Sequence, residues 1–451
     1  MFASLIFRNN RSVWRPLLCA FFACQCWLQV QLESANTMPS QQPISLAAAI
    51  KQLEHTSPQL MLERALALRA HSDRRQLQAE LLPNLRLSGR QSRQRFGNPF
   101  AVMPGDKNPG NDFRSRLELT QVVFDIQKWS DFGKADTALE LAEWNVAILG
   151  QDLKQELVHL YYTYQKSRAE IGILNSNQQR AEELVRLAQL RVNAGTATLL
   201  EQTRAEVRAT NFNSARIDTE LAAVEALSQV KLLLGMPMDQ PLDFSPAAFE
   251  RLQGTVELPE WFESLQAVES LPEWRYQRAA VRRARIVARA ATFKNLPTIE
   301  AFADWGFDSD QAFDGNEANA WMIGLSATIP LYEGGKLFAE RKEAKAALTE
   351  NLARLEHIEK GLQRALYLAD HTTKQRFQQI GIAQKALELG RAEVLQANDE
   401  YQQGLVDNRA LIDAQQSLAD AELDALHTIY NFAVSRLALA RSLGRVERIL
   451  E

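Results

Sequence analysis

The chain has 451 residues, of which 46% are hydrophobic and 24% are charged, and these ordinary values argue against a wholly disordered protein. A mean hydropathy of −0.27 argues against a bundle of membrane-spanning helices. The formal net charge of −4 provides no electrostatic basis for binding nucleic acid.

The N-terminus has the pattern of a secretory signal peptide, which we place at residues 1–35. Three arginines precede an uncharged apolar run over residues 16–32, which suits the hydrophobic region of a signal. The run is short for a membrane anchor, so an uncleaved anchor is the weaker alternative. Cys24 follows Ala23 in a sequence that loosely resembles a lipoprotein cleavage motif, and this leaves lipidation at Cys24 as an alternative to ordinary cleavage. All cysteines lie in this window, so its removal would leave no thiol for a disulfide, a nucleophile or a metal site.

The prolines are distributed unevenly along the rest of the chain. None lies between Gly110 and Met236, and none follows Pro330. Helices of globular proteins end on average after about 12 residues. The two proline-free stretches therefore predict two sets of very long helices.

The sequence also contains an internal repeat. Leu82-Pro83 matches Leu296-Pro297, and the six residues from Thr120 (TQVVFD) resemble the six from Thr328 (TIPLYE). Further along, Gly195 matches Gly404, and Leu234-Gly235 matches Leu443-Gly444. Landmarks that keep their order at a nearly constant offset indicate an internal duplication.

We expect both repeats to have the same order of elements. The first repeat covers residues 36–235, with a helix at about 44–81, a β-hairpin at 84–124 and long helices over 125–235. A linker over 236–260 follows. The second repeat covers residues 261–451, with a helix at about 261–293, a hairpin at 298–332 and long helices over 333–446.

The hairpins alternate between apolar and polar residues. The clearest alternation lies in residues 113–123, 298–308 and 321–329, whereas residues 84–96 are rich in arginine and give the weakest signal. Strands of about ten residues with one apolar face are typical of transmembrane barrels, but the smallest such barrels have about eight strands. Four strands therefore predict either a soluble half-buried sheet or a barrel shared by several chains.

The long helices carry heptad-like spacing with many small residues, as in Ala414, Leu418, Ala421 and Ala425. A continuous helix from Asp125 to Ala194 would span about 100 Å. Such a helix needs neighbours along its whole length, from its own chain and from others.

Together these features resemble the TolC-like outer-membrane efflux protein family, the outer-membrane factors of tripartite efflux or type I secretion systems. The most specific elements are LPNL at 82–85, LYEGGK at 331–336 and YQQGLVDNRALIDAQQ at 401–416. The resemblance implies a mainly α fold with a transmembrane β-barrel. In it, duplicated coiled-coil helices form a trimeric α-barrel tunnel, and four strands per chain contribute to a twelve-stranded barrel. The linker would belong to a small belt around the tunnel, alongside the C-terminal end.

The implied function is a passive outer-membrane exit duct for efflux or type I secretion. The implied partners are two further copies of the chain, a periplasmic adaptor (membrane fusion) protein, an energised inner-membrane transporter and outer-membrane lipid. The alternative is a soluble periplasmic coiled-coil scaffold with a small β domain. We expect no enzyme, no cofactor and no metal site, because the sequence has no P-loop and no H-x-x-x-H pair.

The resemblance also implies site residues at the periplasmic end of the tunnel. Gly195 and Gly404 would be the turns that break the long helices. Asp413, nine residues after Gly404, would form a cation-attracting ring at a pore constriction. Tyr401 and Glu201 would form a hydroxyl–carboxylate link that holds the entrance shut. The second aspartate that the resemblance implies is replaced by Ala410, so a second acidic position is absent. The arginine that it implies two residues after Gly404 is replaced by Val406, so a second link is absent. A solvated helix face is the alternative for Asp413 and Glu201.

One charged run remains outside this interpretation. Six arginines lie within fifteen residues, at 275, 278, 282, 283, 285 and 289. They could face anionic lipid or nucleic acid, but the acidic chain as a whole favours a solvated helix face.

Overall fold

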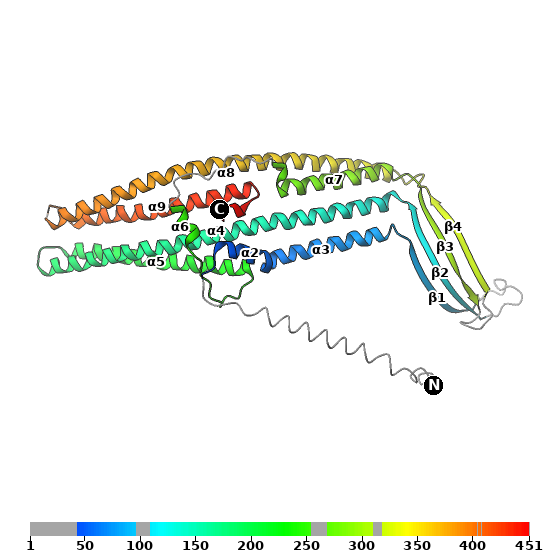
Figure 1. Cartoon of the computed structure of the whole chain (residues 1–451), viewed down its shortest axis with the longest axis horizontal. Coiled ribbons are helices and arrows are strands. Elements are labelled where there is room, and N and C mark those ends of the chain that lie inside the picture. The colour runs from blue at the N-terminus through cyan, green and yellow to red at the C-terminus, as the bar shows by residue number, and fades with distance from the viewer. Residues whose placement is uncertain are drawn as a thin grey trace, which may run out of the picture.

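The computed structural model describes residues 43–95, 109–253, 268–309, 318–403, 405–406 and 408–450. The predicted signal peptide with Cys24, and also Gly404, lie outside the described residues. The molecule is elongated, with long helices that run side by side and a sheet that bends away from them at one end (Figure 1).

The elements follow one another in the same order in both parts of the chain. The first part contains α2 (Leu46–Thr56), α3 (Pro58–Ala79), β1 (Asn84–Gln94), β2 (Gly110–Phe124), α4 (Ile126–Asn193) and α5 (Leu199–Leu234). After α6 (Ala247–Gln253) and η3 (Val268–Ser270), the second part contains α7 (Pro272–Phe293), β3 (Thr298–Ser309), β4 (Ala318–Thr328), α8 (Lys336–Gln402), α9 (Asn408–Ser442) and η4 (Val446–Leu450).

The predicted long helices are present. Helix α4 has 68 residues and α8 has 67, so each is about 100 Å long. Asp125 caps the start of α4, where its carboxylate accepts hydrogen bonds from the backbone N–H groups of Gln127 and Lys128. Both helices fall in the proline-free stretches, where no residue interrupts the backbone hydrogen bonds.

Three boundaries differ from the sequence expectation, and a proline lies at each. The helix expected at about 261–293 begins at Pro272, after the extended Leu271, and residues 261–267 lie outside the described residues. The helix expected at about 44–81 is two helices, because Ser57 is extended before Pro58, the first residue of α3. The fourth strand ends at Thr328 rather than near residue 332. Pro330 follows two residues later and has no N–H to donate to a strand ladder.

The four strands form one antiparallel sheet in the order β1-β2-β3-β4. Its register brings apolar residues into rows across all strands. One row contains Leu87, Leu117, Trp305 and Trp321, and the next contains Leu85, Leu119, Ala303 and Ile323. On the other face Arg116 pairs with Asp308 at 2.6 Å and with Asp304 at 3.8 Å. The sheet therefore has one apolar face and one polar, ion-paired face, as the alternation predicts.

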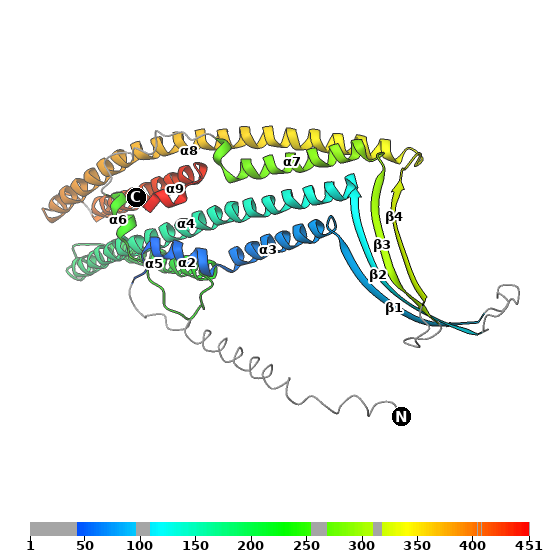
Figure 2. The same ribbon diagram turned by 45° about the vertical axis from the view of Figure 1, so that its right-hand side comes forward.

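The helices next to the sheet lie in one layer in the order α3, α4, α7, α8, which matches the strand order (Figures 1 and 2). Farther from the sheet, α5 packs on α4, and α9 packs on both α8 and α4. Among the described residues, no helix is both long enough and apolar enough to cross a membrane.

The main core lies about halfway along the helices. There Leu157, Val158 and Tyr161 of α4 are completely buried against Phe244 and Phe432. The short elements α2, α6 and η4 contribute to this core, together with parts of α5, α8 and α9. Lys154 of α4 ties two of them together, because it forms ion pairs with Glu54 of α2 and Glu447 of η4. Burial lowers the pKa of Lys154, but these two hydrogen bonds outweigh it and leave the pKa above its ordinary value.

Candidate functional site

The predicted site residues lie at the end of the helices farthest from the sheet, where α4 turns into α5 and α8 into α9 (Figure 1). Gly195 follows the end of α4 with a φ of 69°. The N–H of Gly195 donates to the carbonyl of Val192 at 3.0 Å, and that of Thr196 donates to the carbonyl of Arg191 at 2.9 Å. This is a Schellman turn, which requires a left-handed residue and so favours glycine.

The second turn repeats one of these bonds. The N–H of Leu405 donates to the carbonyl of Glu400 at 2.9 Å. Leu405 and Glu400 are the counterparts of Thr196 and Arg191 in the duplicated sequence. Gly404, the predicted counterpart of Gly195, lies outside the described residues.

Tyr401 is buried next to the turns, with only 4% of its surface exposed. It packs against Leu184, Ala205 and Leu411, so all four long helices meet there. The guanidinium of Arg191 lies over its ring, 4.0 Å from the centroid. Burial, with a contribution from the charge of Glu201, raises the pKa of Tyr401 above its ordinary value, although Arg191 opposes the shift. The hydroxyl is therefore neutral and able to donate a hydrogen bond.

Glu201 has a local partner in the structure. Its carboxylate accepts hydrogen bonds from the backbone N–H of Thr198 at 3.4 Å and from the Thr198 hydroxyl at 3.3 Å. Together with the Thr198 side chain it forms the capping box that starts α5. Glu201 therefore acts on Tyr401 through its charge, while its hydrogen bonds among the described residues go to Thr198 and the ring of Tyr401 stacks with Arg191.

Asp413 lies on the exposed surface of α9 among positive charges. Its carboxylate Oδ2 is 3.7 Å from the Nε of Arg409, one helical turn earlier. Both residues line a hollow of about 440 Å³ between α5 and α9, together with Arg204 and Arg208. Burial lowers the pKa of Arg208, while the charges of Asp420 and Asp413 oppose that shift. The surroundings of the predicted acidic ring therefore include three arginines.

Farther from the turns, polar contacts join α4 to α9, and the sequence analysis did not find them. Arg180 of α4 pairs with Glu422 of α9 at 2.8 Å, and the amide of Asn177 donates to the same carboxylate oxygen at 3.3 Å. Arg180 and Glu422 are 242 residues apart in the chain. The only signal in the sequence is that Glu422 lies next to the small-residue seam at Ala421, and this does not identify a partner.

A second contact of this kind lies closer to the core. Glu170 of α4 is 3.7 Å from the Nε2 of His427 on α9, and Lys166 lies 3.5 Å from the same carboxylate. The nearby imidazole of His427, with the ammonium of Lys166, lowers the pKa of Glu170 below its ordinary value, although partial burial acts in the opposite direction. These α4–α9 contacts join the two halves of the duplication. In the part of the chain that the structure describes, no group of three acidic, histidine or cysteine side chains could hold a metal ion.

Comparison with known proteins gives matches over most of the chain. The family model described as outer membrane efflux protein matches residues 49–236 and 265–445. The proteases secretion protein PrtF of Dickeya chrysanthemi is 24% identical over 56% of this chain, which spans about half of that relative, 55% of its length. The outer membrane protein TolC of Salmonella enteritidis is 22% identical, and the match covers 89% of this chain and 82% of TolC.

The solved structures agree with the fold. The CmeC outer membrane channel of Campylobacter jejuni superposes with a TM-score of 0.80 at 16% identity, over 88% of this chain and 85% of that channel. The long paired helices and the four-stranded sheet therefore form the fold seen in outer-membrane channels.

Proposed function

The chain belongs to the outer membrane efflux protein family, and from this premise we infer that three copies of it form a passive exit duct. The protein is located in the outer membrane, with its helical part in the periplasm, and it acts there as a channel for efflux or secretion. The family consists of channels, and we infer that the chain has no catalytic activity.

The trimer is supported by the open edges of a single copy, both in the sheet and in the helix layer. Strands β1 and β4 each have only one neighbour in the described sheet. The outer helices α3 and α8 expose large apolar side chains on the corresponding edges, among them Leu62, Leu68 and Tyr367. If β1 of one copy pairs with β4 of the next, three four-stranded sheets close into one barrel of twelve strands. The helix layers close into a tunnel in the same way.

The two faces of the sheet suit such a barrel. The apolar rows that contain Leu117, Trp305 and Trp321 face lipid, and the ion pairs of Arg116 face the aqueous interior. The barrel is thus sealed against lipid and open to water. Large aromatic residues such as Trp305 and Trp321 also suit the boundary between lipid and water.

We further infer that the duct uses no energy of its own. The sequence has no nucleotide-binding loop, so a partner must supply the energy. A periplasmic adaptor protein and an energised inner-membrane transporter would deliver the exported substance to the helical end. There Asp413 would narrow the tunnel, and the contacts around Tyr401 and Glu201 would hold the two helix pairs together.

The experiment that tests this proposal is purification of the full chain from outer membranes in detergent. We expect a particle with the mass of three chains and stepwise conductance in planar bilayers. Recovery of the protein in the soluble periplasmic fraction, without conductance, would support the coiled-coil scaffold instead.

A further inference from the structure

The arginine run of α7 forms a surface that the channel function does not explain. Five of its members lie on one face of the helix and are all exposed: Arg275, Arg278, Arg282, Arg285 and Arg289. With about 100° between successive residues, they fall within one stripe about 20 Å long. The sixth arginine, Arg283, is also exposed but points about 120° away from the centre of the stripe.

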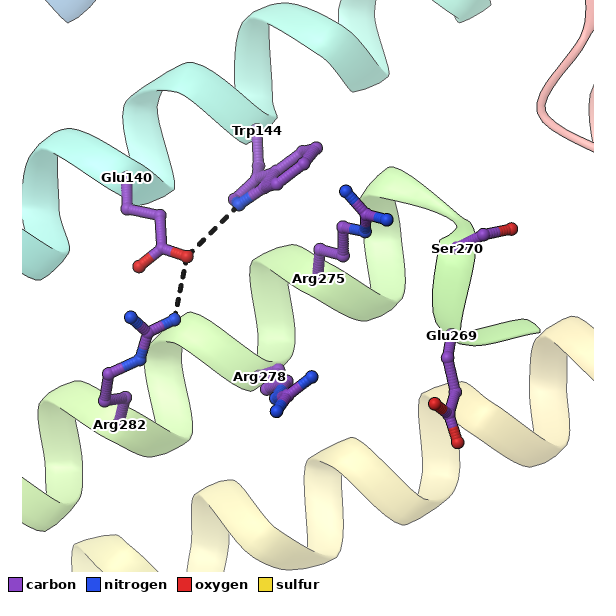
Figure 3. Close-up of a pocket in the computed structure, with 7 residues that line it drawn as sticks. All are labelled: Glu140, Trp144, Glu269, Ser270, Arg275, Arg278 and Arg282. Carbon is purple, nitrogen blue, oxygen red and sulfur yellow. Dashed lines mark hydrogen bonds and ion pairs between the residues drawn. The ribbon is translucent and has the colours of Figure 1, made fainter. Parts of the chain in front are cut away.

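The stripe begins in a hollow of about 480 Å³ between α4, α7 and η3 (Figure 3). Here Arg282 is neutralised by Glu140 at 2.8 Å, and Glu140 also accepts a hydrogen bond from the indole of Trp144 at 3.5 Å. These two bonds are the dashed lines in Figure 3. Glu140 is therefore occupied. The second carboxylate of the hollow, Glu269 of η3, forms no ion pair with Arg275 or Arg278 among the described residues.

Arg275 and Arg278 are held in place by aromatic rings instead of by carboxylates. The guanidinium of Arg275 lies 5.1 Å from the centre of the Trp144 ring, and that of Arg278 lies 5.2 Å from the centre of the Trp274 ring. Stacking on a ring orients a guanidinium while its N–H groups remain available. Among the described residues no ion pair involves Arg275, Arg278, Arg285 or Arg289, so the stripe has unmatched positive charge.

The position of the hollow identifies the compartment that it faces. Trp144 lines this hollow and also a second one formed with Leu53 and Glu54 of α2. Because one side chain lines both hollows, the stripe begins beside α2, one of the short elements of the core. In the proposed trimer these elements surround the tunnel, so the stripe faces the periplasm. This step rests on the proposed function.

Neither a second copy of the chain nor the membrane covers the hollow at the start of the stripe. Helix α7 is flanked by α4 and α8 of its own chain, whereas copies join through α3 and α8. Arg275 is 23 residues before the start of β3, which places it about 35 Å from the sheet along a helical path. Lipid headgroups at the base of the barrel therefore lie too far away to bind in the hollow.

We propose that the arginine stripe of α7 binds an acidic helix of a periplasmic partner protein. Successive arginines are spaced by three or four residues, which repeats every helical turn of about 5.4 Å. A parallel helix with carboxylates at the same spacing presents its charges with the same repeat. A guanidinium can bind a carboxylate through two parallel hydrogen bonds, so Arg275 and Arg278 provide the strongest contacts.

The test uses the full chain purified in detergent and a fluorescein-labelled helical peptide with glutamates at three- and four-residue spacing. Fluorescence anisotropy should show binding that weakens as salt is added. The double variant Arg275→Gln/Arg278→Gln should bind about tenfold more weakly. The matched control Arg283→Gln removes one charge from the other side of α7 and should change affinity by less than about twofold.

A second peptide of the same composition, with its glutamates spread around the helix, separates recognition from general attraction of charge. Equal binding of the two peptides would overturn the proposal, as would an equal loss in the Arg283→Gln control. Binding of anionic lipid vesicles through the same arginines, without binding of the peptide, would overturn it in favour of a membrane surface. Because the assay reads binding alone, a protein that conducts but does not bind contradicts this inference and leaves the channel function intact.

Discussion

The guanidinium of Arg180 on α4 lies 2.8 Å from the carboxylate of Glu422 on α9, and both side chains are mostly shielded from solvent. The contact joins the α4–α5 pair to the α8–α9 pair, between the core and the helix turns. If the channel opens by separation of these pairs, the contact must break. The side-chain oxygen of Asn177 also accepts a hydrogen bond from Arg180, so the group acts as one unit.

We therefore expect Arg180→Ala to loosen the contact between the two helix pairs. The variant should lower the free energy of unfolding by about 1 kcal/mol and increase the fraction of time in the conducting state. Single-channel recordings and thermal unfolding measure the two effects. Arg186→Ala is the control, because Arg186 pairs only within α4, with Glu183, and is well exposed. An equal fraction of time in the conducting state for Arg180→Ala and wild type would contradict a role in holding the pairs together.

Glu201 allows its charge to be separated from its capping role. Glu201→Gln keeps a side chain that can complete the capping box with Thr198, but removes the charge felt by Tyr401. Glu201→Ala also loses the cap and should cost about 1 kcal/mol of stability. If the charge helps to hold the entrance shut, both variants should open more often, but only Glu201→Ala should melt earlier. A wild-type opening frequency in Glu201→Gln would rule out an electrostatic link.

Asp413 should control block of the channel by divalent cations. Asp413→Ala removes one carboxylate from each of three copies, and we expect the half-blocking concentration to rise about tenfold. Arg409→Gln should act in the opposite direction, because it removes the positive charge 3.7 Å from the carboxylate. Bilayer conductance with added divalent cation measures both variants. Unchanged block in Asp413→Ala would show that no acidic ring lines the pore.

The contact between Glu170 and His427 should make stability depend on pH on the acidic side. The pKa of Glu170 is lowered in the folded chain from its ordinary value of 4.5. Its ionised form is therefore favoured by folding, so its contribution is complete above about pH 4.5 and is lost as the pH falls through the lowered pKa. Thermal midpoints between about pH 3 and about pH 6 should fall more steeply in wild type than in Glu170→Gln. Parallel curves for the two proteins would contradict this assignment.

Two glycines with the same backbone conformation should respond differently to alanine. Gly195 and Gly235 have φ values of 69° and 65°, so alanine at either position costs about 1 kcal/mol in backbone strain. A Cβ at Gly195 would meet open space, whereas one at Gly235 would lie 2.9 Å from the carbonyl oxygen of Thr56. Thermal unfolding should therefore show a clearly larger loss for Gly235→Ala. Equal losses would mean that the contact with Thr56 relaxes without cost.

The sequence alone determined the kinds of element and their lengths. Period-two alternation identified the strands, and the absence of prolines identified α4 and α8. These features depend on backbone geometry and on neighbours within a few residues, so a local pattern carries them. The helix boundaries that differed, at Pro58 and Pro272, were also local, and both prolines were visible in the sequence.

Only the tertiary structure decided which side chains meet. Arg180 finds Glu422 across 242 residues, and Arg191 covers the ring of Tyr401 on another helix. Such contacts depend on the angles of the turns and on the twist of helices about 100 Å long, over which small angular differences add up. The side-chain contacts of α7 were also decided by the tertiary structure, because the sequence indicated only a solvated helix face for its arginines. Their stacking on Trp144 and Trp274 follows from how α7 lies against its neighbours.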